Sequence, residues 1–339
     1  MTTEAGTWMA AEIAEQPRVL ADLARRAGEF REVAERLERS RPRFVLFAAR
    51  GSSDNAALYG KYLAEVLLGL PAGLVSPSTT TLYGAEPDLE DVALVAVSQS
   101  GGSPDLVEVT EQAAKRGAFT VAVTNTPDSP LGAAAQHTLD IGAGVERAVA
   151  ATKTYTATLL ALHLLFSGVR GGATAERIGD LAQSCLDGNE ERVAAAAHRL
   201  RFADQVITTA RGYSLATAHE AALKLAETSY LVTRAYSGAD LLHGPIAAVG
   251  QETAVLAVAG TGPGGAAMAE PLARLAGQGA DILRIGPGDD AQLRIPELPE
   301  ELSPVLEVLP LQRLAWALAT SRGYDPDRPA GLRKVTETR

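Results

Sequence analysis

The sequence predicts an α/β protein built from two tandem copies of one unit, a parallel sheet flanked by helices. Short β-branched and aromatic runs alternate with glycine-containing turns and amphipathic stretches, which is the pattern of βαβ units. The order of these segments in the first half then recurs in the second half with a constant offset. The chain has 339 residues, which is long enough for two domains that each bury a core.

Three strands are expected in the first half. Residues 43–48 (RFVLFA) form the first, followed by a glycine turn and a helix to about Leu68. The second strand is expected at 91–98, with a helix after it to about Arg116, and the third strand at 118–125. Strands that alternate with helices in this way form a parallel sheet with right-handed connections.

The second half repeats these segments. The turn at 210–214 (ARGYS) lies 161 residues after the turn at 49–53 (ARGSS), and 252–262 (ETAVLAVAGTG) lies 161 residues after 91–101 (DVALVAVSQSG). Such in-register similarity indicates tandem duplication.

The predicted organisation has four parts. Residues 1–40 form an N-terminal helical arm, 41–185 the first copy of the unit, 186–325 the second copy and 326–339 a C-terminal tail. The arm is polar on one side, as expected of a helix that packs on the body of the protein or on a partner.

Composition and charge exclude several classes of protein. With 31 basic and 41 acidic residues the net charge is -10, so we expect no nucleic-acid or membrane partner. No apolar run reaches the roughly 20 residues of a membrane span. The single cysteine, Cys185, indicates a reducing compartment and a buried apolar role. We expect a cytoplasmic protein without a signal peptide, and without a metal or other cofactor, because no metal-binding motif is present.

A serine-rich turn follows the strand at 91–98. Ser98, Ser100 and Ser103 lie where this strand ends and a helix begins, and Ser53 follows the neighbouring strand. Together these hydroxyls and the free amides of the turn can hold an anion. The alternative is that they only cap the helix. The turn is neither a Walker A loop nor a GxGxxG motif, and we therefore expect a sugar phosphate rather than a nucleotide.

Candidate acid and base groups lie in the second copy. Glu220, Lys224 and Glu227 are spaced i, i+4 and i+7, on one face of a predicted helix. They form either a solvated charge pair or, if Lys224 is buried, a site in which Glu227 acts as a base. His243 lies in a loop bounded by glycine and proline, where it can transfer protons near neutral pH. Lys334 lies in a polar tail that by itself indicates only a frayed end.

The chain resembles the SIS (sugar isomerase) domain family, in particular the isomerase domain of glucosamine-6-phosphate synthase and the SIS-type glucosamine-6-phosphate deaminases. This resemblance implies two tandem SIS-type α/β sandwich subdomains. The motifs that carry it occur in the family's order and cover nearly the whole chain: WMAAEIAEQP (8–17), GSS (51–53), SQSG (98–101), VAATK (149–153), EAALKLAETSY (220–230), AYSGADLLHGP (235–245) and LRKVTETR (332–339).

The resemblance also implies roles for individual residues. Glu227 would move a proton between C1 and C2 of an aminosugar 6-phosphate, with Lys224 beside it. Lys334, in a tail that enters the active site, would meet the sugar carbonyl. His243 would open the sugar ring in the neighbouring subunit's site, which implies a homodimer with shared sites. The residues expected to contact the substrate, with the first five on the phosphate, are Ser53, Ser98, Gln99, Ser100, Ser103 and Ala151.

Three departures from the synthase pattern alter the expected sugar contacts. Ala151 replaces a serine, Ala226 a lysine and Asp240 a glutamate. Because Cys185 is internal, we expect no glutaminase nucleophile and favour a deaminase or isomerase that removes the C2 proton of the open-chain sugar. One alternative is a dehydratase that eliminates the 3-hydroxyl of N-acetylglucosamine 6-phosphate. The other is a non-catalytic sugar-phosphate sensor.

Overall fold

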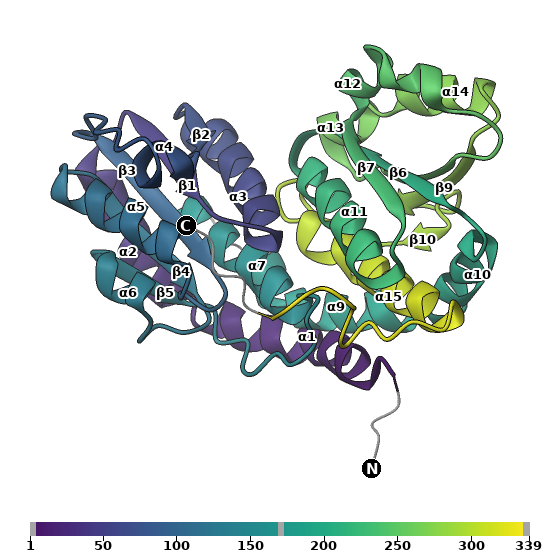
Figure 1. Cartoon of the computed structure of the whole chain (residues 1–339), viewed down its shortest axis with the longest axis horizontal. Coiled ribbons are helices and arrows are strands. Elements are labelled where there is room, and N and C mark those ends of the chain that lie inside the picture. Colours follow the sequence, from purple (N-terminus) through teal and green to yellow (C-terminus); the bar gives the residue numbers. More distant parts are fainter. Residues whose placement is uncertain (1–4, 169–172, 335–339) are drawn as a thin grey trace. The chain divides into compact units, whose positions relative to one another are not determined.

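Two five-stranded sheets, in which every strand pairing is parallel, form the framework of the protein (Figure 1). The computed structural model describes residues 5–168 and 173–334. These residues group into two units. The first-sheet unit comprises 18–146, 154–168 and 173–178, and the second-sheet unit comprises 5–17, 147–153 and 179–334. The predicted α/β class with two similar sheets is confirmed.

The first sheet has the strand order β2-β1-β3-β4-β5. The three predicted strands are present to within one residue, and two strands of three and four residues were missed because they are too short to show a pattern. Since β1 pairs with β2 on one side and β3 on the other, the order reverses between β1 and β3. The strands are β1 (Phe44–Ala48), β2 (Ala72–Leu74), β3 (Val92–Ser98), β4 (Phe119–Thr124) and β5 (His137–Asp140).

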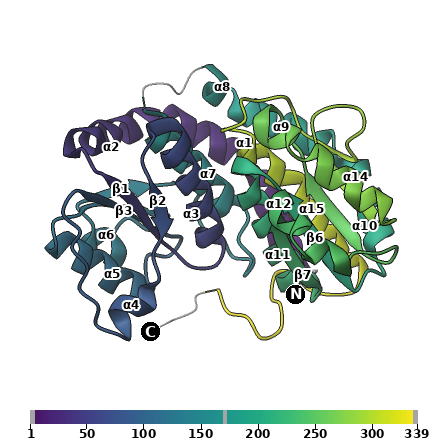
Figure 2. The ribbon, with the colours of Figure 1, turned by 90° about the horizontal axis from the view of Figure 1, so that it is seen from above.

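Helices cover both faces of the first sheet (Figure 2). Alternation along β1 explains this, because Phe47 packs against Phe166 of α7, with ring centroids 5.7 Å apart, while Ala48 joins a cluster with Leu106 and Val109 of α5. The helices of this part of the chain are α2 (Ala27–Ser40), α3 (Ser52–Leu63), continued by a π-helical turn (Ala64–Leu68), α4 (Pro77–Thr81), α5 (Pro104–Lys115), α6 (Pro130–Ala134), α7 (Lys153–Ser167) and α8 (Ala173–Glu176).

The second sheet has the order β10-β9-β8-β6-β7, which is the first sheet's order read in the opposite direction. Its strands are β6 (Gln205–Ala210), β7 (Val232–Ser237), β8 (Ala254–Val258), β9 (Asp281–Gly286) and β10 (Leu293–Arg294). The two copies therefore share one topology, with the reversal of the second falling between β6 and β8. This agrees with the duplication predicted from the 161-residue offset.

Helices again flank the second sheet, with α12 and α14 on one side and α11 and α15 on the other (Figure 1). Ile207 and Val255 of the sheet pack with Leu241 of α12 and Leu275 of α14 in one apolar cluster. The helices are α9 (Ile178–Asp187), α10 (Glu190–Leu200), α11 (Leu215–Ser229), α12 (Gly238–Leu242), α13 (Gly262–Ala266), α14 (Ala269–Gly277) and α15 (Pro304–Ser321), with 3-10 turns at Gly212–Ser214 and Pro245–Ala248.

The residues predicted to form an N-terminal arm fold into two helices, α1 (Thr7–Arg25) and α2. The start of α1 is bound to the C-terminal segment, because the Asp327 carboxylate accepts the backbone N–H groups of Trp8 at 2.9 Å and Met9 at 2.8 Å. The Asp327 carbonyl accepts the N–H of Val149 at 3.1 Å. Segments from three distant parts of the sequence thus meet in the second-sheet unit. Residues 335–339 of the predicted tail lie outside the described residues.

The burial of Cys185 and the hydropathy of the helices were also predicted from the sequence. Cys185 is 2% exposed, and burial raises the pKa of its thiol to about 12, as expected of a packing residue. Across the described ranges, no helix combines the length and apolarity needed to cross a membrane.

Candidate functional site

The carboxyl edge of the first sheet carries the predicted phosphate-binding residues. Ser98 is the last residue of β3, and Ser103 occupies the N-cap position of α5. Ser53 is the second residue of α3, in the helix that follows β1. Because the strand order reverses between β1 and β3, the turns after these two strands flank the crevice where open α/β sheets bind ligands.

Hydrogen bonds within the turn orient two of its hydroxyls. Ser98 Oγ accepts the N–H of Gly101 at 3.2 Å, and Ser100 Oγ accepts the N–H of Gly102 at 3.3 Å. A hydroxyl that accepts from the backbone still has its own proton to donate, so both can donate to an anion. Gly101 has φ +62°, and a Cβ there would clash with Ser129 Oγ, which explains the glycine. Gln99 and Ser103 are half-buried in the same turn.

An ion pair that the sequence did not predict joins the two turns. Arg50, after β1, donates from Nε at 2.9 Å and from Nη2 at 2.8 Å to Asp105 Oδ2 in the first turn of α5. The Asp105 side chain is fully buried and that of Arg50 is 48% exposed, so the pair links the two loops at the edge of the protein surface. The Ala-Arg-Gly sequence that occurs in both copies was the feature of the sequence that could have drawn attention to Arg50.

A cavity of about 370 Å³ lies beside this link, at the carboxyl ends of β1 and β2. Ser76 and Ser78, in a hydroxyl-rich segment that the sequence analysis passed over, line it together with Arg50 and Asp54. Burial raises the pKa of Asp54, and the charge of Arg50 opposes this shift.

The predicted charged stripe on α11 lies largely out of contact with solvent. Lys224 Nζ lies 2.5 Å from Glu227 Oε2 and 3.4 Å from Glu220 Oε1. The Lys224 side chain is 2% exposed and that of Glu220 is 0% exposed, whereas Glu227 is 23% exposed. The group is therefore not a solvated surface pair. Glu227 is the member of the trio that solvent and a ligand can reach.

Lys334 and the segment that carries Ala151 also lie close together. Lys334 Nζ donates to the carbonyl of Ala148 at 2.7 Å, three residues before Ala151. Glu12 of α1 accepts the N–H groups of Arg147 and Ala148 in the same segment. A helix carboxylate and the tail lysine thus hold the same short segment.

Residue Lys153, at the end of that segment, is a buried cation that the sequence analysis did not single out. It is 2% exposed and donates to Glu15 of α1 at 2.6 Å. Gln16, the next residue of α1, donates to Gln312 of α15 at 2.8 Å, and Gln312 donates to the carbonyl of Thr152 at 3.1 Å. The WMAAEIAEQP motif therefore has a structural use, which is to hold residues 147–153.

His243 lies in the turn between α12 and the 3-10 turn at Pro245–Ala248, where it is exposed. The short helix before it was predicted as loop. Ser237 Oγ donates to Asp240 Oδ2 at 2.7 Å and accepts the N–H of Asp240 at 3.1 Å, which fixes the first turn of that helix. In the described chain His243 makes no hydrogen bond to Lys224 or Glu227, so the structure brings together the α11 trio without it.

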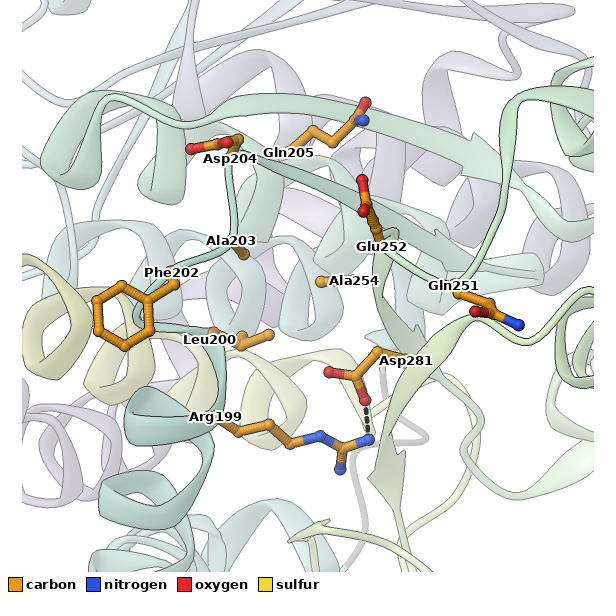
Figure 3. A pocket seen from close by; sticks show the side chains of 10 residues that line it. All are labelled: Arg199, Leu200, Phe202, Ala203, Asp204, Gln205, Gln251, Glu252, Ala254 and Asp281. Atoms are coloured by element: carbon orange, nitrogen blue, oxygen red, sulfur yellow. Dashed lines mark hydrogen bonds and ion pairs between the residues drawn. The ribbon is translucent and has the colours of Figure 1, made fainter.

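A second cavity, of about 470 Å³, opens at the amino ends of the second sheet's strands (Figure 3). Arg199 pairs with Asp281 on its wall, and Asp204 and Glu252 precede β6 and β8. Ligands of open α/β sheets bind at the opposite, carboxyl edge. We therefore assign no site here. Among residues 5–168 and 173–334 no three His, Cys, Asp or Glu side chains are grouped to hold a metal ion.

Comparison with known proteins gives the family. The SIS domain model matches residues 40–168 and 199–321. The chain is 33% identical over 96% of its length to glutamine–fructose-6-phosphate aminotransferase [isomerizing] of Gloeobacter violaceus, of which it covers 58%, and 34% identical to the Thermococcus kodakarensis protein of that name, with 96% and 57% covered. It thus spans a little more than half the length of these relatives.

Solved structures agree with this. A Silicibacter pomeroyi DSS-3 protein named as a candidate phosphosugar isomerase is 36% identical, with a TM-score of 0.78 and coverage of 95% of this chain and 100% of the other. Glucosamine-6-phosphate deaminase of Thermotoga maritima is 25% identical, with a TM-score of 0.79 and coverage of 98% and 100%. The two matched segments each contain one of the two sheets, and the chain belongs to the SIS domain family.

Proposed function

We propose that this protein is an enzyme of the sugar-phosphate isomerase type that acts on an aminosugar 6-phosphate, and that it converts glucosamine 6-phosphate to fructose 6-phosphate and ammonia. The buried trio on α11 carries this proposal. A sensor needs only to bind its ligand, whereas a partly exposed carboxylate held against a buried lysine is an arrangement for proton transfer.

The proposed reaction begins from the open-chain sugar, whose C1 carbonyl acidifies the C2 proton. Glu227 removes that proton and returns it to C1, which converts the aldehyde with its C2 amine into a C2 imine with a C1 hydroxyl. Water then adds to C2 and ammonia leaves, so that a ketone remains. Lys224 keeps the Glu227 carboxylate in one position through their 2.5 Å contact.

The other proposed roles follow the family resemblance. Ser53, Ser98, Gln99, Ser100 and Ser103 hold the 6-phosphate. Lys334 meets the sugar carbonyl, and its bond to the Ala148 carbonyl shows that its ammonium group already lies beside the segment that contains Ala151. His243 assists ring opening.

The activity test is to incubate the purified protein separately with glucosamine 6-phosphate and N-acetylglucosamine 6-phosphate. We expect ammonia from the first sugar and neither ammonia nor a new chromophore from the second. Coupled enzymatic detection of ammonia and ultraviolet absorbance measure the two outcomes. If neither sugar gives ammonia or a new chromophore, the result would contradict an enzymatic function and favour a sensor.

A second candidate reaction is supported by the small residues Ala151 and Ala226, which stand where the synthase has a serine and a lysine. Their smaller side chains leave room for an acetyl group. The same C2 deprotonation of N-acetylglucosamine 6-phosphate would then expel the 3-hydroxyl as water and create a conjugated aldehyde. A chromophore from the acetylated sugar alone would establish this dehydratase in place of the deaminase.

We also propose a homodimer in which His243 serves the partner's site. Co-refolding an inactive Glu227→Gln chain with an inactive His243→Ala chain is then expected to restore about a quarter of the wild-type activity. Random pairing makes half of the dimers mixed, and each mixed dimer has one intact site of two. Ammonia release is the readout. Mixed dimers that form, as seen by differential tagging, and yet stay inactive would place His243 in its own chain's site.

A further inference from the structure

The turn after β8 in the second sheet is the counterpart of the candidate phosphate turn after β3. The 161-residue offset pairs Gly262 with Gly101 and Gly212 with Gly51, and all four glycines have positive φ, between +57° and +81°. Both sheets reverse their strand order between the two strands that precede these turns. The two turns therefore share the positive-φ glycines and the place in the strand order, but the helix that follows begins at Gly262 in the second copy and only at Pro104, the counterpart of Gly265, in the first.

In the second copy the place of a ligand is taken by a carboxylate of the chain itself. The N–H of Gly264, the counterpart of Ser103, donates to Glu300 Oε1 at 2.7 Å. A Cβ built on Gly262 or on Gly264 would clash with the Glu300 carboxylate, and one built on Gly212 would lie 3.5 Å from it. Glycines from two turns thus enclose this side chain.

The hydroxyls that remain in the second copy also bind acceptors of the chain. Ser214, the counterpart of Ser53, donates to Glu307 Oε1 at 2.8 Å, and Thr217 donates to Glu307 Oε2 at 3.0 Å. Thr261, the counterpart of Ser100, donates to the carbonyl of Leu298 at 2.8 Å, two residues before Glu300. Donors that follow β6 and β8 therefore bind the Leu298 carbonyl and the carboxylates of Glu300 and Glu307.

The first copy differs in this respect. Within the described part of the chain no atom lies within 4 Å of a Cβ built on Gly51, whereas Glu300 is near the equivalent position on Gly212. Glu307 is fully buried, and this burial raises the pKa of its carboxyl to about 7, with the neighbouring charge of Glu300 acting in the same direction. The two carboxylates thus lie in one region of the second copy, where Glu300 binds the Gly264 amide and Glu307 binds the Ser214 and Thr217 hydroxyls.

We propose that Glu300 and Glu307 take the place of a phosphate in the second copy, so that the chain contains a latent phosphate site that opens when the Glu300 carboxylate is removed. The comparison rests on the proposed phosphate role of the first turn. That amides and hydroxyls of the second copy bind carboxylates of the same chain rests on the contacts of Glu300 and Glu307 alone.

The test uses thermal unfolding of the full chain in a Ser98→Ala/Ser100→Ala background, in which the first turn is disabled. Glu300→Ala is expected to lower the melting temperature in sodium chloride. Replacing chloride by inorganic phosphate at equal ionic strength is expected to raise it by roughly 2 to 4 °C more than in the background protein, because phosphate binds only the folded state.

Two control variants make this result specific. Glu300→Gln keeps the volume and an acceptor for Gly264, so it is expected to gain nothing from phosphate beyond the background. Glu297→Ala removes an exposed carboxylate of the same segment. It is expected to change the melting temperature neither in chloride nor in phosphate. An equal phosphate effect in Glu300→Ala and in the background, or an equal gain in Glu300→Gln, would overturn the proposal.

If Glu300→Ala does not fold in chloride, its refolding yield from urea in phosphate and in chloride gives the same comparison. A higher yield in phosphate supports the latent site, and equal yields contradict it. Since no sugar is turned over in either measurement, a failure here is distinguishable from a failure of the proposed deaminase activity.

Discussion

Replacing Glu227 by glutamine is expected to slow exchange of the C2 proton of glucosamine 6-phosphate in deuterated water by about 100- to 10,000-fold, the usual contribution of a positioned general base. The amide is nearly isosteric and can stay beside Lys224, but it cannot accept the proton. Affinity for the sugar phosphate should change little, because only the interaction made in the transition state is lost. Proton NMR measures the exchange, and calorimetry measures the affinity.

Glu220→Gln is the matched control for this experiment. Glu220 lies on the other side of Lys224, at 3.4 Å, but its side chain is 0% exposed and cannot reach a bound sugar. We expect Glu220→Gln to retain exchange once its stability has been checked by thermal unfolding. Exchange at the wild-type rate in Glu227→Gln together with its loss in Glu220→Gln would reassign the base.

The double variant Ser98→Ala/Ser100→Ala is expected to weaken binding of a sugar 6-phosphate by about 100-fold or more. Each hydrogen bond to a charged group is worth about 1.5 to 3 kcal/mol, and 1.4 kcal/mol corresponds to a factor of ten. The loss should be confined to phosphorylated sugars. Calorimetric titration with a sugar 6-phosphate measures it, and the net charge of -10 means that no general attraction compensates for the loss.

Ser76→Ala/Ser78→Ala provides the control with the same change in composition. These hydroxyls line the cavity beside β2 rather than the turn after β3. They are expected to leave the affinity for the phosphate unchanged. Unchanged affinity in the Ser98/Ser100 variant, with weaker binding in the Ser76/Ser78 variant, would move the phosphate to that cavity.

The sequence predicted the elements with a strong local pattern. Strands β1, β3 and β4 were found because their apolar runs end at glycine-containing turns, and the α11 trio because helical spacing places Glu220, Lys224 and Glu227 on one face. Spacing could not show that Lys224 is buried. Burial depends on α15, which packs on α11 from nearly 90 residues further along the chain.

Long-range pairs left no local signal. Glu300 lies in a proline-containing loop, 36 residues from the Gly264 amide that it binds, and no periodicity marks it. In the turn at 259–264, Ala259 and Gly264 stand where the first copy has Ser98 and Ser103, whereas Thr261 keeps a hydroxyl. The contact of Glu300 with this turn depends on the tertiary fold, so the sequence could not predict it.

The binding of α1 to the C-terminal segment has a consequence for the order of events during synthesis. Gly6 and Trp8 donate to Asp325 and Asp327, which lie 319 residues further along the chain. At about 5 to 20 residues per second, those partners leave the ribosome roughly 16 to 64 s after the helix that needs them. All five strands of the first sheet are synthesised by residue 140 and can pair during this interval. The start of α1 therefore reaches its contacts with Asp325 and Asp327 only at the end of synthesis, and until then the buried Met9 is open to chaperones or to other nascent chains. Glu12 and Glu15, further along the same helix, can bind residues 147–153 much earlier.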